Sequence, residues 1–243
     1  MNPETAAGYT ISSPNHKNMA KLPDLLPELP GLPGLHARNI YCIGRNYAAH
    51  ARELNNPIPE RPVIFTKPLS SLTFDGIIRI PPFVREPHFE TELVAVIGTP
   101  GKNIQRDDAL NHIAGYGIGI DVTARDIQQE LKAAAHPWFL AKGMDTFAPV
   151  SSFLPADKLP DSEELTFTLS VNRELRQSGD PSLMLFPVPE LIAQLSRYVT
   201  LQPGDLLFTG TPEGVGLLRP GDSLHAELLL GRIVLDVRVE TSN

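Results

Sequence analysis

Cysteine is nearly absent from this sequence of 243 residues, which contains only Cys42, so no disulfide can form within the chain. This excludes the small secreted domains that depend on disulfides and suits a reducing compartment such as the cytoplasm. Cys42 lies in the apolar run NIYCIG, where a free cysteine is usually buried. We therefore expect a core thiol at this position.

Basic clusters and long apolar runs are also missing. The formal net charge is -7, whereas nucleic acids and anionic membrane surfaces select basic patches, so we expect neither as a partner. No apolar run approaches the roughly 18 residues that span a bilayer. The opening stretch MNPETAAGYTISSPNHKNMAK resembles neither a secretory signal nor an Arg-rich transit peptide. These absences predict a cytoplasmic protein whose partner is a small molecule.

Proline is abundant instead, with 24 residues, and many of them fall in the early stretch LPDLLPELPGLPGL. Proline at this density prevents long helices and favours extended segments. We predict an N-terminal arm over residues 1–38, disordered in its first twenty residues, and one main domain over residues 39–243.

Short strand-like segments dominate that main domain. Most are β-branched or aromatic and end at Gly, Pro, Asp or Asn. They are NIYCIG, PVIFTK, GIIRI, ELVAVIG, AGYGIGID, LTFTLSVN, DLLFTG, SLHAELL and RIVLDVRVE. Helical patterns are fewer, namely YAAHAREL, RDDALNHI, VTARDIQQELKAA and PELIAQLSRYV. Because strands and helices do not alternate regularly, the sequence predicts a β-rich α+β fold.

Two carboxylates interrupt the apolar stretch PHFETELVAVIG. Glu90 and Glu92 are two residues apart, so in a strand they point to the same face. The run from Leu93 to Ile97 shows no polar alternation, which indicates a strand buried on both sides. Buried carboxylates need a partner, and one divalent cation can serve both. A solvated edge strand is the alternative, because Glu-x-Glu alone is a weak motif.

A third acid, Asp121, ends the small-residue run GYGIGID just before a helical pattern. It can cap that helix, or it can complete an oxygen-rich shell suited to Mg²⁺ or Mn²⁺. The lack of a Cys or paired-His set argues against zinc. Arg125 and Gln128 are three residues apart on the same helix and share a face, where they can either grip a carboxylate or remain solvated.

Several stretches together resemble the fumarylacetoacetate hydrolase family, most closely its small acylpyruvase-like members. They are YCIGRNYAAHARE, PVIFTKP, HFETELVAVIG, GYGIGIDVTARDIQ, PWFLAKGMDTFAPV, VNRELRQSG and GDLLFTGTPEGVG, in family order from about Asn39 onward. The resemblance implies a rolled, mixed β-sandwich with peripheral helices, a catalytic domain over residues 39–243 and a homodimer. It also implies that Glu90, Glu92 and Asp121 are ligands of Mg²⁺ or Mn²⁺.

The resemblance implies 2-oxo acid substrates with a second carbonyl group, in which the metal polarises the keto group and stabilises an enolate. His50 and Glu53 look like the dyad, carried on a mobile lid from Arg45 to Glu60, that activates the hydrolytic water. By spacing alone, such a pair is more often a surface pair. Lys142 looks like the family lysine that stabilises the enolate or orients the substrate.

Substrate-binding roles are implied at Arg45, Arg125, Gln128 and Thr211. Thr211 lies in TGTPEGVG, which resembles a phosphate loop but lacks its Gly-Lys-Ser/Thr ending and a following helix, so we expect no nucleotide there.

The chain departs from the family pattern around these positions. Phe89, preceded by His88, stands where family members often have a second histidine. Gly143 and Met144 follow the lysine where relatives commonly carry a bulkier polar or aromatic pair, which leaves the substrate open.

Two activities fit these residues. The first is metal-dependent hydrolysis of acylpyruvates, such as fumarylpyruvate or acetylpyruvate, to pyruvate and a carboxylic acid, with oxaloacetate decarboxylation as a side activity. The second is isomerisation or decarboxylation of unsaturated 2-oxo diacids in aromatic catabolism, which needs no hydrolytic water. A sugar-acid dehydratase and a metal-stabilised binding module without turnover are further alternatives.

Overall fold

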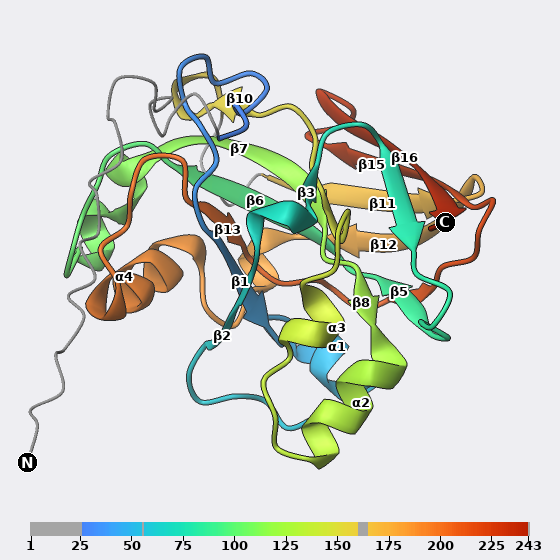
Figure 1. The fold of residues 1–243 in the computed structure, drawn as a ribbon. Helices are drawn as coiled ribbons and strands as arrows, with labels where there is room; N and C mark the ends of the chain where they lie inside the picture. The colour runs from blue at the N-terminus through green and yellow to red at the C-terminus, as the bar shows by residue number, and fades with distance from the viewer. Residues whose placement is uncertain (1–25, 55, 160–164, 243) are drawn as a thin grey trace, which may run out of the picture.

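The computed structural model of this protein describes residues 26–54, 56–159 and 165–242 (Figure 1). The strands are β1 Ile40–Gly44, β2 Val63–Lys67, β3 Leu72–Thr73, β4 Ile77–Ile80, β5 Pro87–Phe89, β6 Thr91–Ile97, β7 Ile113–Ile120, β8 Thr123–Ala124, β9 Ala148–Pro149, β10 Leu154–Pro155, β11 Phe167–Val171, β12 Glu174–Gly179, β13 Leu206–Phe208, β14 Gly216–Leu217, β15 Ser223–Leu228 and β16 Ile233–Thr241. The α-helices are α1 Ala48–Glu53, α2 Arg125–Ala133, α3 Phe139–Lys142 and α4 Val188–Tyr198. Short 3-10 helices are η3 Leu69–Ser71, η4 Arg106–His112, η5 Ala156–Lys158 and η7 Pro181–Leu183.

Two large sheets hold most of the core. One has the strand order β10-β7-β6-β13-β1-β2 and the other the order β12-β11-β15-β16-β4. Most neighbours are antiparallel, but β1 pairs with β13 and β16 with β4 in parallel, so both sheets are mixed. Strand β7 of the first sheet contacts β15 and β16 of the second, and Figure 1 shows the helices at the periphery. The predicted β-rich α+β fold with a mixed β-sandwich is confirmed.

Every sequence run that was predicted to be a strand contains one. The apolar side chains of these runs pack on the buried faces of the sheets. The run RDDALNHI forms the 3-10 helix η4 rather than an α-helix. Apart from β13, which lies in DLLFTG, the sequence missed the strands of two or three residues, which are too short to show periodicity. It also missed β12, whose side chains are mostly exposed at the edge of its sheet.

Helix α4 follows directly from its sequence pattern. A proline begins it, and Val188, Leu191, Ile192 and Leu195 are buried at helical spacing. Its position against η4 closes one end of the first sheet (Figure 1).

The described part of the predicted arm, residues 26–38, packs against the first sheet. Leu29 and Leu32 are buried in a hydrophobic cluster with Phe153 and Phe208. The backbone amide of Phe153 also donates to the carbonyl of Pro30 at 2.7 Å. The domain boundary at residue 39 stays a prediction, and the predicted disorder of the first twenty residues lies outside the described residues.

Cys42 is fully buried on β1, and burial raises the pKa of its thiol well above the ordinary value. The predicted core thiol is confirmed. None of the helices in the described part of the chain has the length and apolar character needed to cross a membrane.

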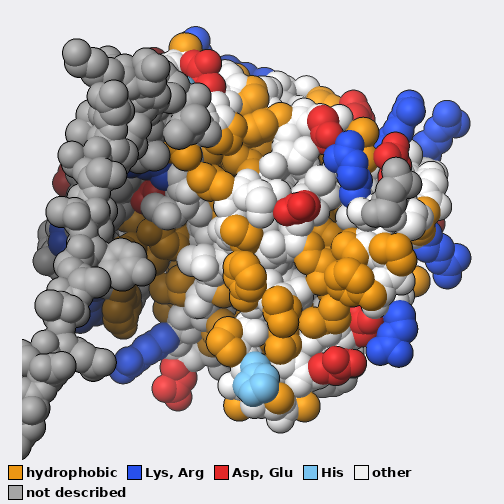
Figure 2. Space-filling model, in the orientation of Figure 1, with side chains coloured by type: hydrophobic (Ala, Val, Ile, Leu, Met, Phe, Trp, Pro, Cys, Tyr) orange, Lys and Arg blue, Asp and Glu red, His pale blue; other side chains and the backbone are white. Residues whose placement is uncertain are grey.

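Some apolar side chains remain at the surface. Phe139 and Leu140 of α3 are more than half exposed, at 53% and 61%. Figure 2, in the orientation of Figure 1, shows hydrophobic side chains gathered in patches between charged ones on this face.

Two glycines of β7 make room for aromatic rings. A Cβ at Gly117 would lie 2.7 Å from a ring carbon of Phe153, and one at Gly119 would lie 2.6 Å from a ring carbon of Phe208. Gly119 is also the register partner of Glu92 on β6. The glycines of GYGIGID therefore let β7 pack closely against the rings of Phe153 and Phe208. This packing fixes the position of Asp121, the acid that follows the strand.

We predict that Gly119→Ala lowers the free energy of unfolding by about 1–3 kcal/mol, because the added methyl group overpacks a buried site. Denaturant unfolding measures this change. Gly44→Ala is the matched control, since its nearest contact would be a ring carbon of Trp138 at 3.4 Å. Equal stability of the two variants would contradict the packing argument.

Candidate active site

The three predicted acids converge although they come from two strands. Glu92 lies on β6, Glu90 just before it, and Asp121 follows the antiparallel neighbour β7. The amide of Asp121 donates to the carbonyl of Glu90 at 2.7 Å. One oxygen from each side chain lies within 4.8 Å of the others, and all three residues are buried. We call Glu90, Glu92 and Asp121 the carboxylate cluster; such a group can hold a metal ion.

Asp121 does not cap helix α2. The residue before that helix is Ala124, and no side chain caps its first turn. The alternative role of Asp121 as a helix cap was therefore wrong, because the short strand β8 lies between Asp121 and the helix.

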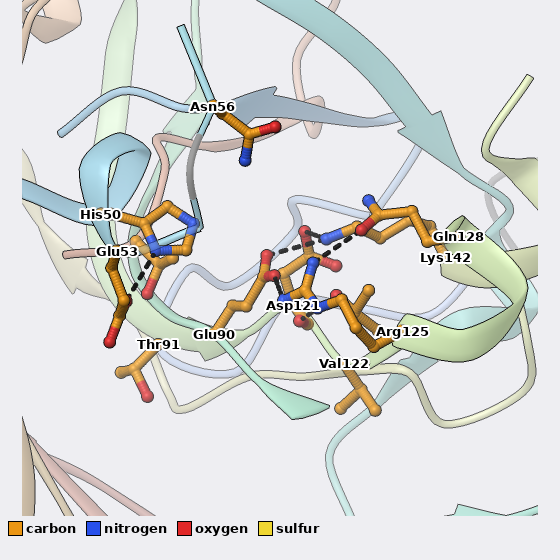
Figure 3. A network of polar contacts seen from close by, with 12 residues as sticks. His50, Glu53, Asn56, Glu90, Thr91, Asp121, Val122, Arg125, Gln128 and Lys142 are labelled. Atoms are coloured by element: carbon orange, nitrogen blue, oxygen red, sulfur yellow. Dashed lines mark hydrogen bonds and ion pairs between the residues drawn. The ribbon is translucent and has the colours of Figure 1, made fainter. Parts of the chain in front are cut away.

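Buried cations hold two members of the carboxylate cluster. Nζ of Lys142 lies 2.8 Å from Oε2 of Glu90 and 2.6 Å from Oδ2 of Asp121 (Figure 3). The guanidinium of Arg125 also donates to Glu90, and it donates to Oε1 of Gln128 at 2.6 Å. The predicted common face of Arg125 and Gln128 is thus present, and it faces a carboxylate of the protein.

Lys67 is a member of the site that the sequence reasoning missed. It ends β2, and its buried Nζ lies 2.7 Å from Oδ1 of Asp121. The same ammonium group donates to the carbonyls of Val122, at 3.1 Å, and Lys142. A signal was available, because PVIFTKP ends an apolar strand with a lysine, and lysine is almost never fully buried without a partner.

Glu92 differs electrostatically from the other two acids. It accepts a hydrogen bond from the amide of Gly210 at 2.8 Å, but no Lys, Arg or His among the described residues forms an ion pair with it. Burial, followed by the nearby carboxylate of Asp121, raises the pKa of Glu92 well above the ordinary value. Glu92 therefore lacks a compensating positive charge.

Burial also acts to raise the pKa of Glu90, but the charges of Lys142 and Arg125 outweigh it and lower this pKa. A metal ion would supply the missing charge at Glu92. Because the ligand atoms that the carboxylate cluster offers are all carboxylate oxygens, the cluster fits a hard cation such as Mg²⁺ or Mn²⁺.

The predicted dyad is present on α1. Nδ1 of His50 lies 3.3 Å from Oε2 of Glu53, and His50 is buried whereas Glu53 is partly exposed (Figure 3). Oε1 of Glu53 accepts a hydrogen bond from the amide of Gly214 at 3.0 Å. Helix α1 is therefore fastened to the loop that also reaches Glu92 through Gly210. The mobility of the segment from Arg45 to Glu60 stays a prediction.

A cavity of about 100 Å³ opens beside the carboxylate cluster. Its walls comprise Gly44, Arg45, His50, Leu54, Asn56, Phe65, Glu90, Arg125, Gln128, Gln129, Lys132, Trp138 and Lys142. His50, Lys142 and three of the predicted substrate-binding residues thus share one cavity.

Thr211 is the one predicted substrate-binding residue that does not line the cavity. It is buried, and its hydroxyl accepts a hydrogen bond from Nε2 of Gln177 at 2.8 Å. Oε1 of Gln177 in turn accepts from the amide of Thr91 at 3.0 Å. Gln177, also missed from the sequence, ties the loop of Thr211 to the strand that carries Glu92.

Phe89, His88 and Gly143, at which this chain departs from the family pattern, each have defined surroundings in the structure. Phe89 is buried beside Gly216, with the guanidinium of Arg176 5.8 Å from its ring, so this ring belongs to the packing beside the site. Burial, then the charge of Arg125, lowers the pKa of His88 to about 4. A Cβ at Gly143 would lie 2.9 Å from Pro68, which follows Lys67.

Comparisons with known proteins agree with this geometry. The family model described as fumarylacetoacetate (FAA) hydrolase C-terminal matches residues 39–238. The mitochondrial oxaloacetate tautomerase FAHD1 of Arabidopsis thaliana is 45% identical over 200 residues, covering 82% of this chain and 90% of the relative. The mitochondrial oxaloacetate decarboxylase of Dictyostelium discoideum is 44% identical over 186 residues, covering 76% of this chain and 85% of the relative.

Solved structures give the same result. The fumarylpyruvate hydrolase of Pseudomonas aeruginosa, in complex with Mn²⁺ and pyruvate, has a TM-score of 0.81 and 36% identity, covering 89% of this chain and 98% of the other. The 2-hydroxyhepta-2,4-diene-1,7-dioate isomerase of Mycobacterium marinum has a TM-score of 0.75 and 36% identity, covering 86% of this chain and 77% of the other. The family model, the identities and the shared fold establish that this chain belongs to the fumarylacetoacetate hydrolase family.

Proposed function

We propose that this protein is a divalent-metal-dependent hydrolase that cleaves acylpyruvates, such as fumarylpyruvate or acetylpyruvate, to pyruvate and a carboxylic acid. The observation that carries this proposal is the His50–Glu53 pair, whose histidine lines the same cavity as Glu90 of the carboxylate cluster. A base beside a metal site is the arrangement needed to activate water next to a polarised carbonyl group.

The carboxylate cluster would hold Mg²⁺ or Mn²⁺, which supplies Lewis-acid polarisation of the 2-oxo acid when bound. The related fumarylpyruvate hydrolase was crystallised with Mn²⁺ and pyruvate, which supports this assignment. In this chain Glu92 contributes the carboxylate that has no cationic partner of its own among the described residues.

His50 would take a proton from water, while Glu53 orients the imidazole and favours its protonated form. The hydroxide adds to the acyl carbonyl carbon, and the bond to the neighbouring methylene carbon then breaks. The electron pair moves to the pyruvate fragment as an enolate, which takes up a proton to give pyruvate.

Lys142 would stabilise the negative charge that develops on the pyruvate fragment. Its ammonium group lies between Glu90 and Asp121, and although burial acts to lower the pKa of Lys142, the charges of these two acids raise it. The lysine is therefore held protonated as a fixed positive charge rather than as a base.

We predict that EDTA abolishes pyruvate release from acetylpyruvate and that Mg²⁺ or Mn²⁺ restores it.

We also predict that Glu92→Gln weakens Mn²⁺ binding by at least about tenfold in calorimetry, because the substitution removes a ligand charge but keeps the side-chain shape. Glu213→Gln removes a charge from the exposed part of the adjacent loop and is the control. Full activity of Glu92→Gln after it has lost metal binding would rule the proposal out.

A second candidate is proton transfer or decarboxylation on a 2-oxo diacid without hydrolysis. Relatives called oxaloacetate tautomerase and oxaloacetate decarboxylase, at 44–45% identity, favour it, as does the structural likeness to the dioate isomerase. This reaction can use the same metal and enolate but requires no water-activating base.

His50→Gln separates the two candidates. A hydrolase should lose about 10²–10⁴-fold in the rate of pyruvate release, because it loses its general base, while its metal affinity is retained. His225→Gln, on the exposed face of β15, is the control. If His50→Gln releases pyruvate at the wild-type rate, the water-activating role is wrong, and oxaloacetate becomes the next substrate to assay.

A homodimer and a cytoplasmic location complete the proposal. The exposed apolar side chains of α3, next to the edge strand β2, offer a surface for a second copy (Figure 2). We expect light scattering to give twice the mass of the chain; the mass of a single chain would contradict the dimer.

The relatives from Arabidopsis and Dictyostelium are named as mitochondrial proteins, and the cytoplasmic location of this chain stays a prediction.

A further inference from the structure

Helix α2 lays a row of polar side chains along the cavity. Arg125, Gln128, Gln129 and Lys132 follow the spacing i, i+3, i+4 and i+7, so they share one face, and all four line the cavity. With a rise of 1.5 Å per residue, the two ends of this row are roughly 10 Å apart along the helix. Arg125 is buried against Glu90, whereas Lys132 is exposed. The row therefore runs from the carboxylate cluster to the open end of the cavity.

The open end carries two cations. Arg45 and Lys132 both line it, and within residues 26–54, 56–159 and 165–242 neither forms an ion pair with a carboxylate. Burial, followed by the charges of Arg45 and Arg125, lowers the pKa of Lys132. These positive charges thus lie close enough to disfavour one another, and a bound anion would relieve that repulsion.

Asn56 adds a neutral polar group to this end. Its Oδ1 accepts a hydrogen bond from Nζ of Lys132 at 3.1 Å. Figure 3 shows its side chain directed toward the space between His50 and Gln128. The amide nitrogen of Asn56 can donate to a ligand there while its oxygen remains bound to Lys132.

Apolar side chains also line the cavity. Leu54, Phe65 and Trp138 line its walls, and the rings of Phe65 and Trp138 meet edge to face with their centroids 5.6 Å apart. Such a surface suits a hydrocarbon segment rather than a second charged group. The cavity therefore presents a metal-binding end, an apolar wall and a cationic end.

We propose that Arg45, Asn56 and Lys132 form a second subsite that binds the distal carboxylate of the substrate, so that the preferred 2-oxo acids are diacids. This inference rests on the proposed function for the position of the 2-oxo group beside the carboxylate cluster. Two cations and an amide can bind a carboxylate through charge-assisted hydrogen bonds. Among the acylpyruvates, fumarylpyruvate carries such a distal carboxylate and acetylpyruvate does not.

Binding of two matched ligands tests the subsite without requiring turnover. 2-Oxoadipate and 2-oxohexanoate have the same number of carbons and differ only in ending in a carboxylate or a methyl group. Neither is an acylpyruvate, so hydrolysis does not interfere. Trp138 is the only tryptophan of the chain and lines the cavity, so its fluorescence reports binding to the Mg²⁺-loaded protein, with calorimetry as a second readout.

We expect 2-oxoadipate to bind at least about tenfold more tightly than 2-oxohexanoate. Lys132→Met should remove most of this preference and leave the affinity for 2-oxohexanoate unchanged, and Lys132→Arg should restore part of it. Lys102→Met makes the same charge change at an exposed lysine outside the cavity walls and should preserve the preference.

Equal affinities of the wild-type protein for the two ligands would overturn the subsite. A Lys132→Met protein that loses affinity for both ligands equally would also overturn it, since Lys132 would then only support Asn56. Pyruvate release from acetylpyruvate tests the proposed function separately. Release without a diacid preference rejects the subsite alone, whereas a diacid preference without release rejects hydrolysis alone.

Discussion

The burial of three carboxylates in one cluster constrains the rest of this structure. An uncompensated buried charge costs several kcal/mol, so each acid must meet a cation or strong hydrogen-bond donors. Lys67, Arg125 and Lys142 balance the three acids in number, but they contact only Glu90 and Asp121. The imbalance at Glu92 makes a metal ion fit here, and the added positive charge in turn suits an anionic substrate.

These charge contacts also set the arrangement of the elements around the site. The cations come from the end of β2, the start of α2 and the end of α3, and each helix is held to the sheet where its cation reaches an acid. The loop after β13 joins them by donating the amide of Gly210 to Glu92. The same loop holds Glu53 through the amide of Gly214, so the His50–Glu53 pair is positioned relative to the carboxylate cluster through backbone contacts.

In our proposals, the residues that act on the 2-oxo acid and the residues that select the acyl portion lie at opposite ends of the cavity. The groups that we expect to act on the 2-oxo acid lie at the buried end, where a low dielectric strengthens their interactions. The groups that we expect to select the acyl portion lie at the open end, on α2 and in the segment that follows α1. Changes at the open end can therefore alter which substrate binds while the buried end remains the same. The matched relatives include proteins named as a hydrolase, a tautomerase and an isomerase.

The sequence by itself determined the features that depend on local periodicity and on family motifs. Apolar runs predicted the strands, the spacing of Glu90 and Glu92 predicted a shared face, and the spacing of Arg125 and Gln128 predicted theirs. Only the tertiary structure decided which distant groups meet. Lys67, Gln177 and Lys132 were missed, and the local pattern around Asp121 did not distinguish a helix cap from the metal ligand that the family motif implied. Their partners lie tens of residues away along the chain, and no local pattern encodes a contact made when strands and loops fold together.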